Sequence, residues 1–108
     1  MKTIAASEKV LRVLEDFTPG ASLEAKLEYL TRESLQRRLQ ACNEALSRFE
    51  AKYGLTFTDF ARSWREDKIP AKHTHTVERD FMEWEACHLE KEEVLTAARE
   101  LGLPEPEP

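Results

Sequence analysis

The stretch FEAKYGLTFTDFARSWR, residues 49–65, contains the clearest helix boundary in the chain and decides how the rest is organised. Gly54 suits the left-handed residue that closes a helix, so the preceding helix is expected to end at Tyr53. Thr56 can accept a hydrogen bond from the first free amides of a following helix. The stretch therefore predicts a second, short helix over residues 57–65.

The sequence also predicts the direction of this short helix relative to the preceding one. Asp59 lies three residues after the cap and resembles a capping box with aspartate in place of glutamate. Leu55 and Phe60 are spaced for a hydrophobic staple, which fixes the angle at which the helix leaves. Phe57, Phe60 and Trp64 then fall on one side of it.

Before this boundary, the pattern predicts one long helix from Ser22 to Tyr53. Its later apolar positions follow the 4-3-4-3-4 spacing of a coiled-coil seam, which predicts packing against a second helix without saying which chain supplies it. The seam residues are Leu35, Leu39, Cys42, Leu46, Phe49 and Tyr53. An earlier apolar set, Leu23, Leu27 and Leu30, is displaced by one position, so the stripe either rotates or breaks near residues 31–33.

The length of this helix bears on assembly. Unbroken, it would be about 48 Å long. A compact domain of this size is only about 35 Å across. The molecule is therefore elongated, or the helix breaks, or a second copy covers the overhang. We expect a homodimer, with the seam building either the scaffold of the chain or the dimer interface.

Shorter elements flank these two helices. Ser7 can cap a helix bearing Val10, Leu11, Leu14 and Phe17, which Thr18-Pro19-Gly20 would end. A polar loop over residues 66–76 leads to a last helix, capped by Thr76 or His75, that runs to about Leu101 and stops at Gly102. Residues 104–108 are expected to be a disordered Pro/Glu tail, and residues 2–5 a short strand at most.

The expected fold class is thus all-α. It is an elongated helical hairpin or bundle with a long central helix, a short capped helix and a long C-terminal helix, forming a single domain over residues 1–103.

Composition narrows the classes of partner. A net charge of −5 without a clustered basic face disfavours nucleic acid and favours a basic protein partner. No apolar run reaches the roughly 18 residues that a membrane span requires. Without a secretory signal, Cys42 and Cys87 are expected to be free thiols in a cytoplasmic protein, with a disulfide between packed helices as the alternative.

The aromatic residues have two readings. They can form the core between the short helix and the last one, or part of the set can be exposed and anchor a partner. Trp84 is the favoured anchor, because Glu83 and Glu85 beside it would keep the surface acidic. The predicted partner-binding set is Phe60, Trp64, Asp80, Phe81, Glu83, Trp84 and Glu85.

The acidic last helix likewise has two interpretations, a solvated face or a patch that captures a cationic partner. Its carboxylate pairs, Asp80 with Glu83 and Glu90 with Glu93, are spaced as in metal-dependent helical hydrolases. Both pairs fall on one helix, about 15 Å apart along its axis, so they could not share a metal.

Other enzyme signatures are equally weak. The chain has only three glycines and no glycine-rich phosphate loop. Cys87 and His88 are adjacent on a helix, and together with His73 and His75 they match no closed zinc framework. We therefore expect no catalytic residue, metal or cofactor.

Residues 49–60, FEAKYGLTFTDF, followed by residues 78–85, ERDFMEWE, resemble small helical prokaryotic proteins regarded as antitoxin-like. In those proteins a helix ending in tyrosine-glycine precedes a phenylalanine-bearing short helix, a polar linker and an acidic helix with glutamate-tryptophan-glutamate. The resemblance covers roughly the last two thirds of the chain. It implies a partner-neutralising subunit of a toxin–antitoxin pair, with a basic toxin as the partner. The alternatives are a small metal-dependent helical hydrolase and a purely structural homo-oligomer.

Overall fold

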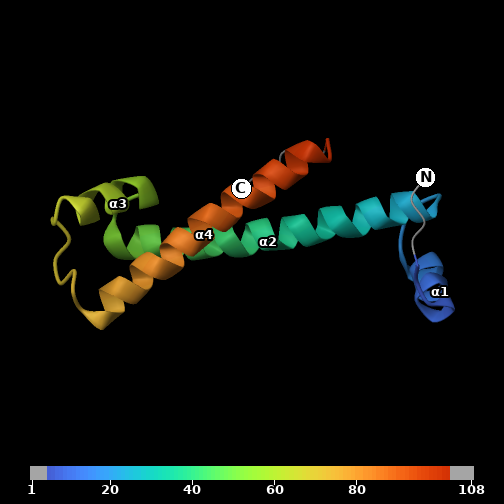
Figure 1. The fold of residues 1–108 in the computed structure, drawn as a ribbon, viewed down its shortest axis with the longest axis horizontal. Helices are drawn as coiled ribbons and strands as arrows, with labels where there is room; N and C mark the ends of the chain where they lie inside the picture. Colours follow the sequence, from blue (N-terminus) through green and yellow to red (C-terminus); the bar gives the residue numbers. More distant parts are fainter. Residues whose placement is uncertain (1–4, 103–108) are drawn as a thin grey trace. The chain divides into compact units, whose positions relative to one another are not determined.

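The computed structural model describes residues 5–102 and contains four α-helices in this range (Figure 1). They are α1 (Glu8–Phe17), α2 (Leu23–Tyr53), α3 (Phe57–Arg65) and α4 (His75–Glu100). The described residues include no strand, which confirms the all-α class. Most of the short strand considered at residues 2–5, and the tail over residues 104–108, lie outside the described residues.

The helix ends follow local chemistry. Ser7 and Thr56 cap α1 and α3 by accepting from the amides of Val10 and Asp59, as predicted. Gly54 adopts a φ of +68°, the left-handed conformation expected after α2. The cap of α4 was misplaced in the prediction, because Thr74, not Thr76 or His75, accepts from the amide of Val77.

Helix α2 is continuous through residues 31–33, so the predicted alternative of a break there is wrong. Thr31 donates a hydrogen bond from Oγ1 to the carbonyl of Leu27 at 2.8 Å, a bond that a threonine makes inside a helix. The chain nevertheless divides into two compact units, residues 1–35 and 36–108. We refer to their described parts, residues 5–35 and 36–102, as the N-terminal unit and the C-terminal unit.

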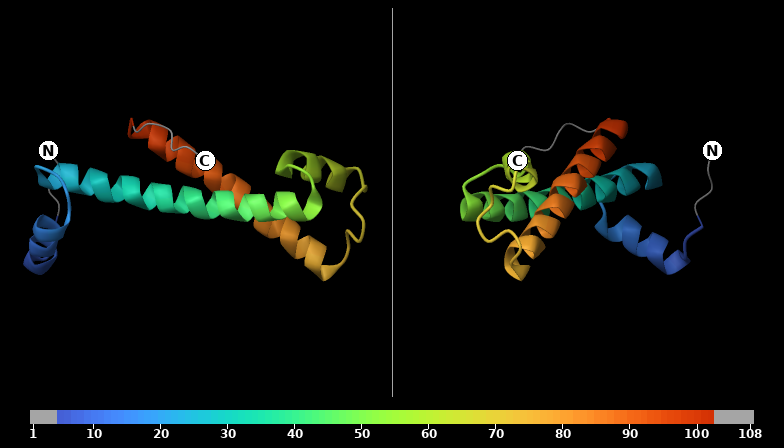
Figure 2. Two further views of the ribbon diagram at one scale, coloured as in Figure 1. Left: turned by 180° about the vertical axis from the view of Figure 1, so that it is seen from behind. Right: turned by 60° about the vertical axis from the view of Figure 1, so that its left-hand side comes forward.

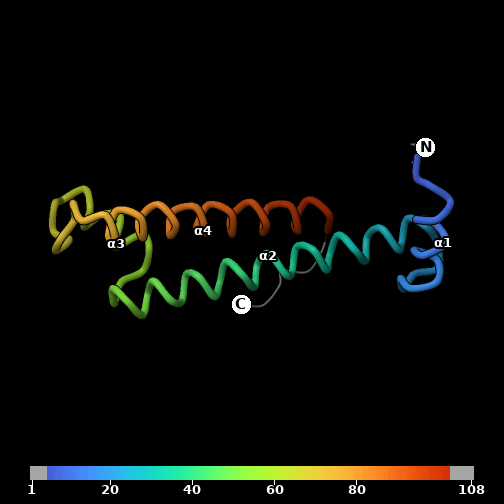
Figure 3. The backbone as a smooth tube through the Cα atoms, turned by 90° about the horizontal axis from the view of Figure 1, so that it is seen from below, coloured from blue at the N-terminus to red at the C-terminus, as the bar shows by residue number. Residues whose placement is uncertain are grey.

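The C-terminal unit is built on α4, which runs beside the C-terminal half of α2 in the opposite direction (Figure 3). Helix α3 lies next to the end of α2 in both views of Figure 2 and closes the core at that end. Together the three helices enclose the buried apolar side chains of the described chain. These are Leu39, Cys42, Ala45, Leu46, Phe49, Phe60, Trp84, Val94 and Ala98.

The N-terminal unit contains α1 and the first turns of α2, joined by a turn at Gly20. Gly20 has a φ of +136°, and a Cβ there would come within 2.9 Å of the Lys26 backbone nitrogen. The Lys26 ammonium donates to the carbonyl oxygens of Thr18, at 2.5 Å, and Glu15, at 3.4 Å, which holds the end of α1 against α2. None of the described residues of this unit is buried.

Candidate functional site

Helix α4 has an inner face in the core and an outer face in solvent. Trp84, Val94 and Ala98 are buried on the inner face, and Phe81 is half-buried beside them. The candidate site was predicted around Trp84, so its position on the inner face changes which residues can meet a partner.

Trp84 is enclosed by aromatic rings from the other two helices of the unit. Its ring stacks on those of Phe49 and Tyr53, with centroids at 5.5 and 5.7 Å, and lies 4.8 Å from that of Phe60. Trp84 and Phe60 are both 0% exposed. The indole Nε1 of Trp84 has no hydrogen-bond partner within the described chain.

The prediction that Trp84 and Phe60 anchor a partner at the surface is therefore wrong. Its reasoning relied on Glu83 and Glu85, which flank Trp84 in sequence. Neighbours in a helix point about 100° apart, so exposed glutamates at these positions do not place the tryptophan between them on the surface. The spacing of Phe81, Trp84 and His88 by three and four residues was the informative signal, and it points inward.

Trp64 and Phe81 are half-buried and serve mainly as architecture. Their ring centroids are 4.5 Å apart, which joins α3 to α4. The Lys72 ammonium lies 5.1 Å from the centroid of the Trp64 ring and donates to the Trp64 carbonyl oxygen at 2.8 Å. This cation–π contact holds the loop between α3 and α4 against the core.

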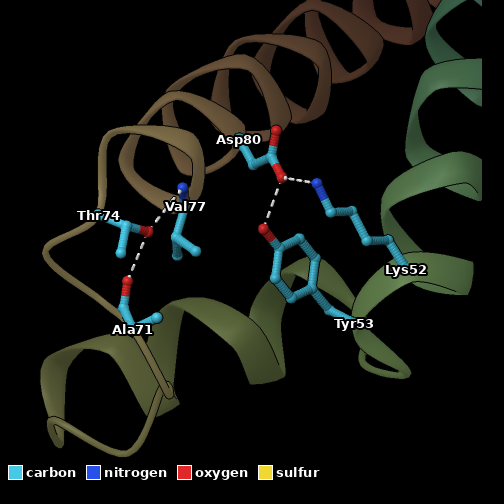
Figure 4. A network of polar contacts seen from close by, with 6 residues as sticks. All are labelled: Lys52, Tyr53, Ala71, Thr74, Val77 and Asp80. Atoms are coloured by element: carbon cyan, nitrogen blue, oxygen red, sulfur yellow. Dashed lines mark hydrogen bonds and ion pairs between the residues drawn. The ribbon is translucent and has the colours of Figure 1, made fainter.

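Asp80, another predicted partner contact, joins α4 to the end of α2 (Figure 4). Its Oδ2 accepts from Lys52 Nζ at 2.6 Å and from Tyr53 Oη at 2.5 Å, and its side chain is only 14% exposed. Burial acts to raise the pKa of Asp80, but the hydrogen bonds from Lys52 and Tyr53 and the positive charges of Lys52 and Arg79 hold it below its ordinary value. Burial and the bond to Asp80 raise the pKa of Tyr53 to about 12.

A second polar contact joins the helices farther along. Glu90 accepts from Arg38 at 3.0 Å and from the Cys42 thiol at 3.5 Å. Burial, the hydrogen bond to Glu90 and its negative charge raise the pKa of Cys42 to about 11, and burial also raises that of Cys87. Both cysteines are free, and both thiols are protonated at neutral pH.

The seam of α2 faces the core of its own chain. Leu39, Cys42, Leu46 and Phe49 are buried, and Tyr53 is half-buried against Trp84. Because α4 of the same chain supplies contacts from Glu90 to Asp80 along this seam, the prediction that the seam joins two copies is wrong for these positions. Leu35 belongs to the N-terminal unit, where it is half-buried.

The carboxylate pairs considered for metal chemistry are separated by these contacts. Asp80 and Glu90 turn toward α2, whereas Glu83 and Glu93 are exposed. Within residues 5–102, no three side chains of His, Cys, Asp or Glu converge as a metal site requires.

The outer face of α4 combines exposed carboxylates with two exposed apolar side chains. Met82 is 70% exposed and Leu89, two helical turns on, is 51% exposed. A shallow groove of about 410 Å³ begins at Leu89 and continues toward the end of the helix. We define the acidic face of α4 by the exposed residues Glu78, Met82, Glu85, Leu89, Glu92, Glu93 and Glu100.

Of the predicted partner set, Glu85 lies on this face, whereas Glu83 is exposed but lies outside it. Met82 and Leu89 were missed, although their seven-residue spacing outside the inner stripe was a readable signal.

Comparison of the chain with protein-family models, with curated proteins and with solved structures gave no significant match. Among the described residues, no helix combines the length and the apolar character needed to cross a membrane.

Proposed function

We propose that this chain is a protein-interaction subunit that binds a basic protein through the acidic face of α4, in the manner expected of the antitoxin-like proteins it resembles. The observation that carries the proposal is the exposure of Met82 and Leu89 among carboxylates on one side of a helix. Interfaces need apolar contact at their centre and a polar rim, and this face offers both.

Charge supports a basic partner. Helix α4 contains eight Asp and Glu residues against three Lys and Arg, a balance equal to the net charge of −5 of the whole chain. Asp80 and Glu90 are engaged with α2, and the remaining six carboxylates are exposed. Such a concentration of one sign attracts a cationic protein and orients its approach.

The spacing of the apolar residues describes the partner further. Met82 and Leu89 are about 10.5 Å apart along the helix axis. A partner helix with apolar side chains two turns apart, flanked by Lys or Arg, would place both on this face. Methionine adapts to the shape of what it contacts, which suits such a surface.

The test is co-expression with the product of the neighbouring gene, followed by an affinity measurement on the purified pair. Glu85→Lys/Glu93→Lys should raise Kd at least about tenfold, since it reverses charge in the acidic face. Met82→Lys should act in the same direction. The matched control is Glu28→Lys/Glu44→Lys, which makes the same charge change at exposed positions of α2 and should leave Kd within about threefold.

Two results would overturn the proposal. One is the absence of both a stable complex and any rescue of growth when the neighbouring product is expressed. The other is an equal loss of affinity in the control variant, which would reduce the effect to net charge alone.

A further inference from the structure

The N-terminal unit presents an apolar groove that no other part of the unit covers. The groove has a volume of about 430 Å³ and is lined by Val10, Val13, Leu14, Phe17 and Leu30, with Lys9 and Thr18 at its border. We refer to it as the α1 groove.

The groove is an ordered feature of α1. Val10, Val13, Leu14 and Phe17 follow the i, i+3, i+4, i+7 spacing of one helix face. That face is open, because Val10 is 57% exposed, Val13 53% and Phe17 81%. The bonds from Lys26 to the end of α1 hold the groove in place.

This degree of exposure calls for a cover. An isolated helix of ten residues is marginal in water and owes its stability to packing of its apolar face. Contiguous exposed apolar surface of this kind marks a site of association. The seam of α2 cannot offer an alternative site of self-association, because its central residues are already buried against α4.

The charges beside the groove identify the occupant. Lys9 and Asp16 are seven residues apart, so they lie on the same flank of α1, two turns from each other. When two copies of α1 pair antiparallel, this flank meets itself in reverse order, and Lys9 of each copy lies near Asp16 of the other. A twofold interface requires such a self-complementary patch. A parallel pair would instead place this flank against the opposite flank of the partner helix, so that Lys9 and Asp16 would not meet.

We infer that the α1 groove is the docking site for a second copy of this chain, with the two α1 helices antiparallel and Lys9 of each paired with Asp16 of the other. A lipid surface fits less well, since helices that lie on membranes have a basic polar face, whereas α1 carries Lys9 and Arg12 against three carboxylates.

Sedimentation equilibrium tests the pairing between about 1 and 200 μM, a range that brackets the micromolar affinity of small interfaces. The wild type should shift from monomer to dimer mass. Phe17→Glu should raise the dimer Kd at least about tenfold, because it replaces the most exposed apolar side chain of the groove by a charge. The matched control is Leu101→Glu, an exposed apolar position of the C-terminal unit outside the acidic face of α4, which should dimerise like the wild type.

A charge exchange tests the antiparallel arrangement. Lys9→Glu leaves two carboxylates, the introduced one and that of Asp16, beside Arg12 on the flank, and Asp16→Lys makes the flank wholly basic. Neither variant alone can form the Lys9–Asp16 pairs, so each should dimerise at least about fivefold more weakly. Their equimolar mixture should form a heterodimer, since the glutamate introduced in one variant then meets the lysine introduced in the other, and the native Asp16 and Lys9 also meet. A merely structural loss in either single variant would not be repaired by mixing.

Three results would overturn the inference. A wild type that stays monomeric over the whole range removes the dimer. A monomer that gains helicity only on vesicles of zwitterionic or anionic lipid assigns the groove to a membrane surface. A mixture of the two charge variants without a heterodimer removes the antiparallel pairing.

Discussion

The two units of this chain share an amphipathic pattern, but the apolar face is buried in one unit and exposed in the other. In the C-terminal unit, Phe60 and Trp84 are completely enclosed, whereas in the N-terminal unit Phe17 is 81% exposed. Both α1 and the inner face of α4 space their apolar residues by three and four. The pattern thus predicts that a face is covered. In the C-terminal unit the same chain covers it, whereas in the N-terminal unit none of residues 5–35 does.

The largest expected effect comes from deleting an enclosed ring. Trp84→Ala should lower the free energy of unfolding of the C-terminal unit by about 3–5 kcal/mol, because it leaves a cavity among the surrounding rings. Phe17→Ala, at a concentration where the chain is monomeric, should change it by less than about 0.5 kcal/mol. Urea denaturation followed by circular dichroism measures both.

The losses of unfolding free energy in these two variants measure the difference in burial between the units. Losses of similar size would mean that the α1 groove is closed within the monomer, and the distinction drawn between the units would fail.

A smaller effect is expected at the polar link between α2 and α4. Asp80→Asn should cost about 1–2 kcal/mol, since the charge-assisted bonds from Lys52 and Tyr53 are weakened. Glu83→Gln, at an exposed carboxylate on the same helix, should stay within about 0.5 kcal/mol. Equal effects of the two substitutions would show that the contacts of Asp80 stabilise the fold no more than those of an exposed carboxylate.

The same link predicts a dependence on pH. The pKa of Asp80 is lower in the folded chain than its ordinary value of 3.8, so the unfolded chain takes up the proton first as the pH falls. Its stabilising contribution is therefore present above that value and is lost as the pH drops below about 4. The difference in unfolding free energy between wild type and Asp80→Asn should shrink over this acidic window, and a constant difference would contradict the assignment.

The smallest effect on overall stability is expected from a pair of glycines. Gly54→Ala should cost the C-terminal unit about 1 kcal/mol, because its φ of +68° disfavours a side chain although the space around it is open. Gly20→Ala should leave the unfolding of that unit unchanged and instead remove amide protection from α1, since the new Cβ would meet the Lys26 backbone. Hydrogen exchange separates the two, and a lowered stability of the C-terminal unit in Gly20→Ala would show that the units fold as one.

Local chemistry made much of this fold predictable. The end of α2 at Tyr53, the cap at Thr56 and the bounds of α3 follow from contacts within a few residues, and they were predicted correctly. The start of α4 was not, because Thr74 also donates to the carbonyl of Ala71 in a turn where Ala71 adopts a φ of +56°. The spacing of apolar residues in a helix does not predict such a turn, so it could not indicate that the helix begins after Thr74.

The site was harder to predict than the elements. A heptad seam requires a partner helix, but only the path of the chain through α3 brings α4 to Leu46 and Phe49. Trp84 was assigned to the surface from its sequence neighbours, whereas its direction depends on residues three and four positions away. Met82 and Leu89 could be recognised as exposed apolar side chains only once the inner face of α4 was known.

The placement of the two tryptophans has a practical consequence. Trp64 and Trp84 both lie in the C-terminal unit, and the described part of the N-terminal unit contains none. Intrinsic indole emission therefore reports on the α2–α3–α4 core and is blind to melting of α1. An emission trace that precedes or follows the ellipticity trace during denaturation would separate the two units optically, without a label or an added chromophore.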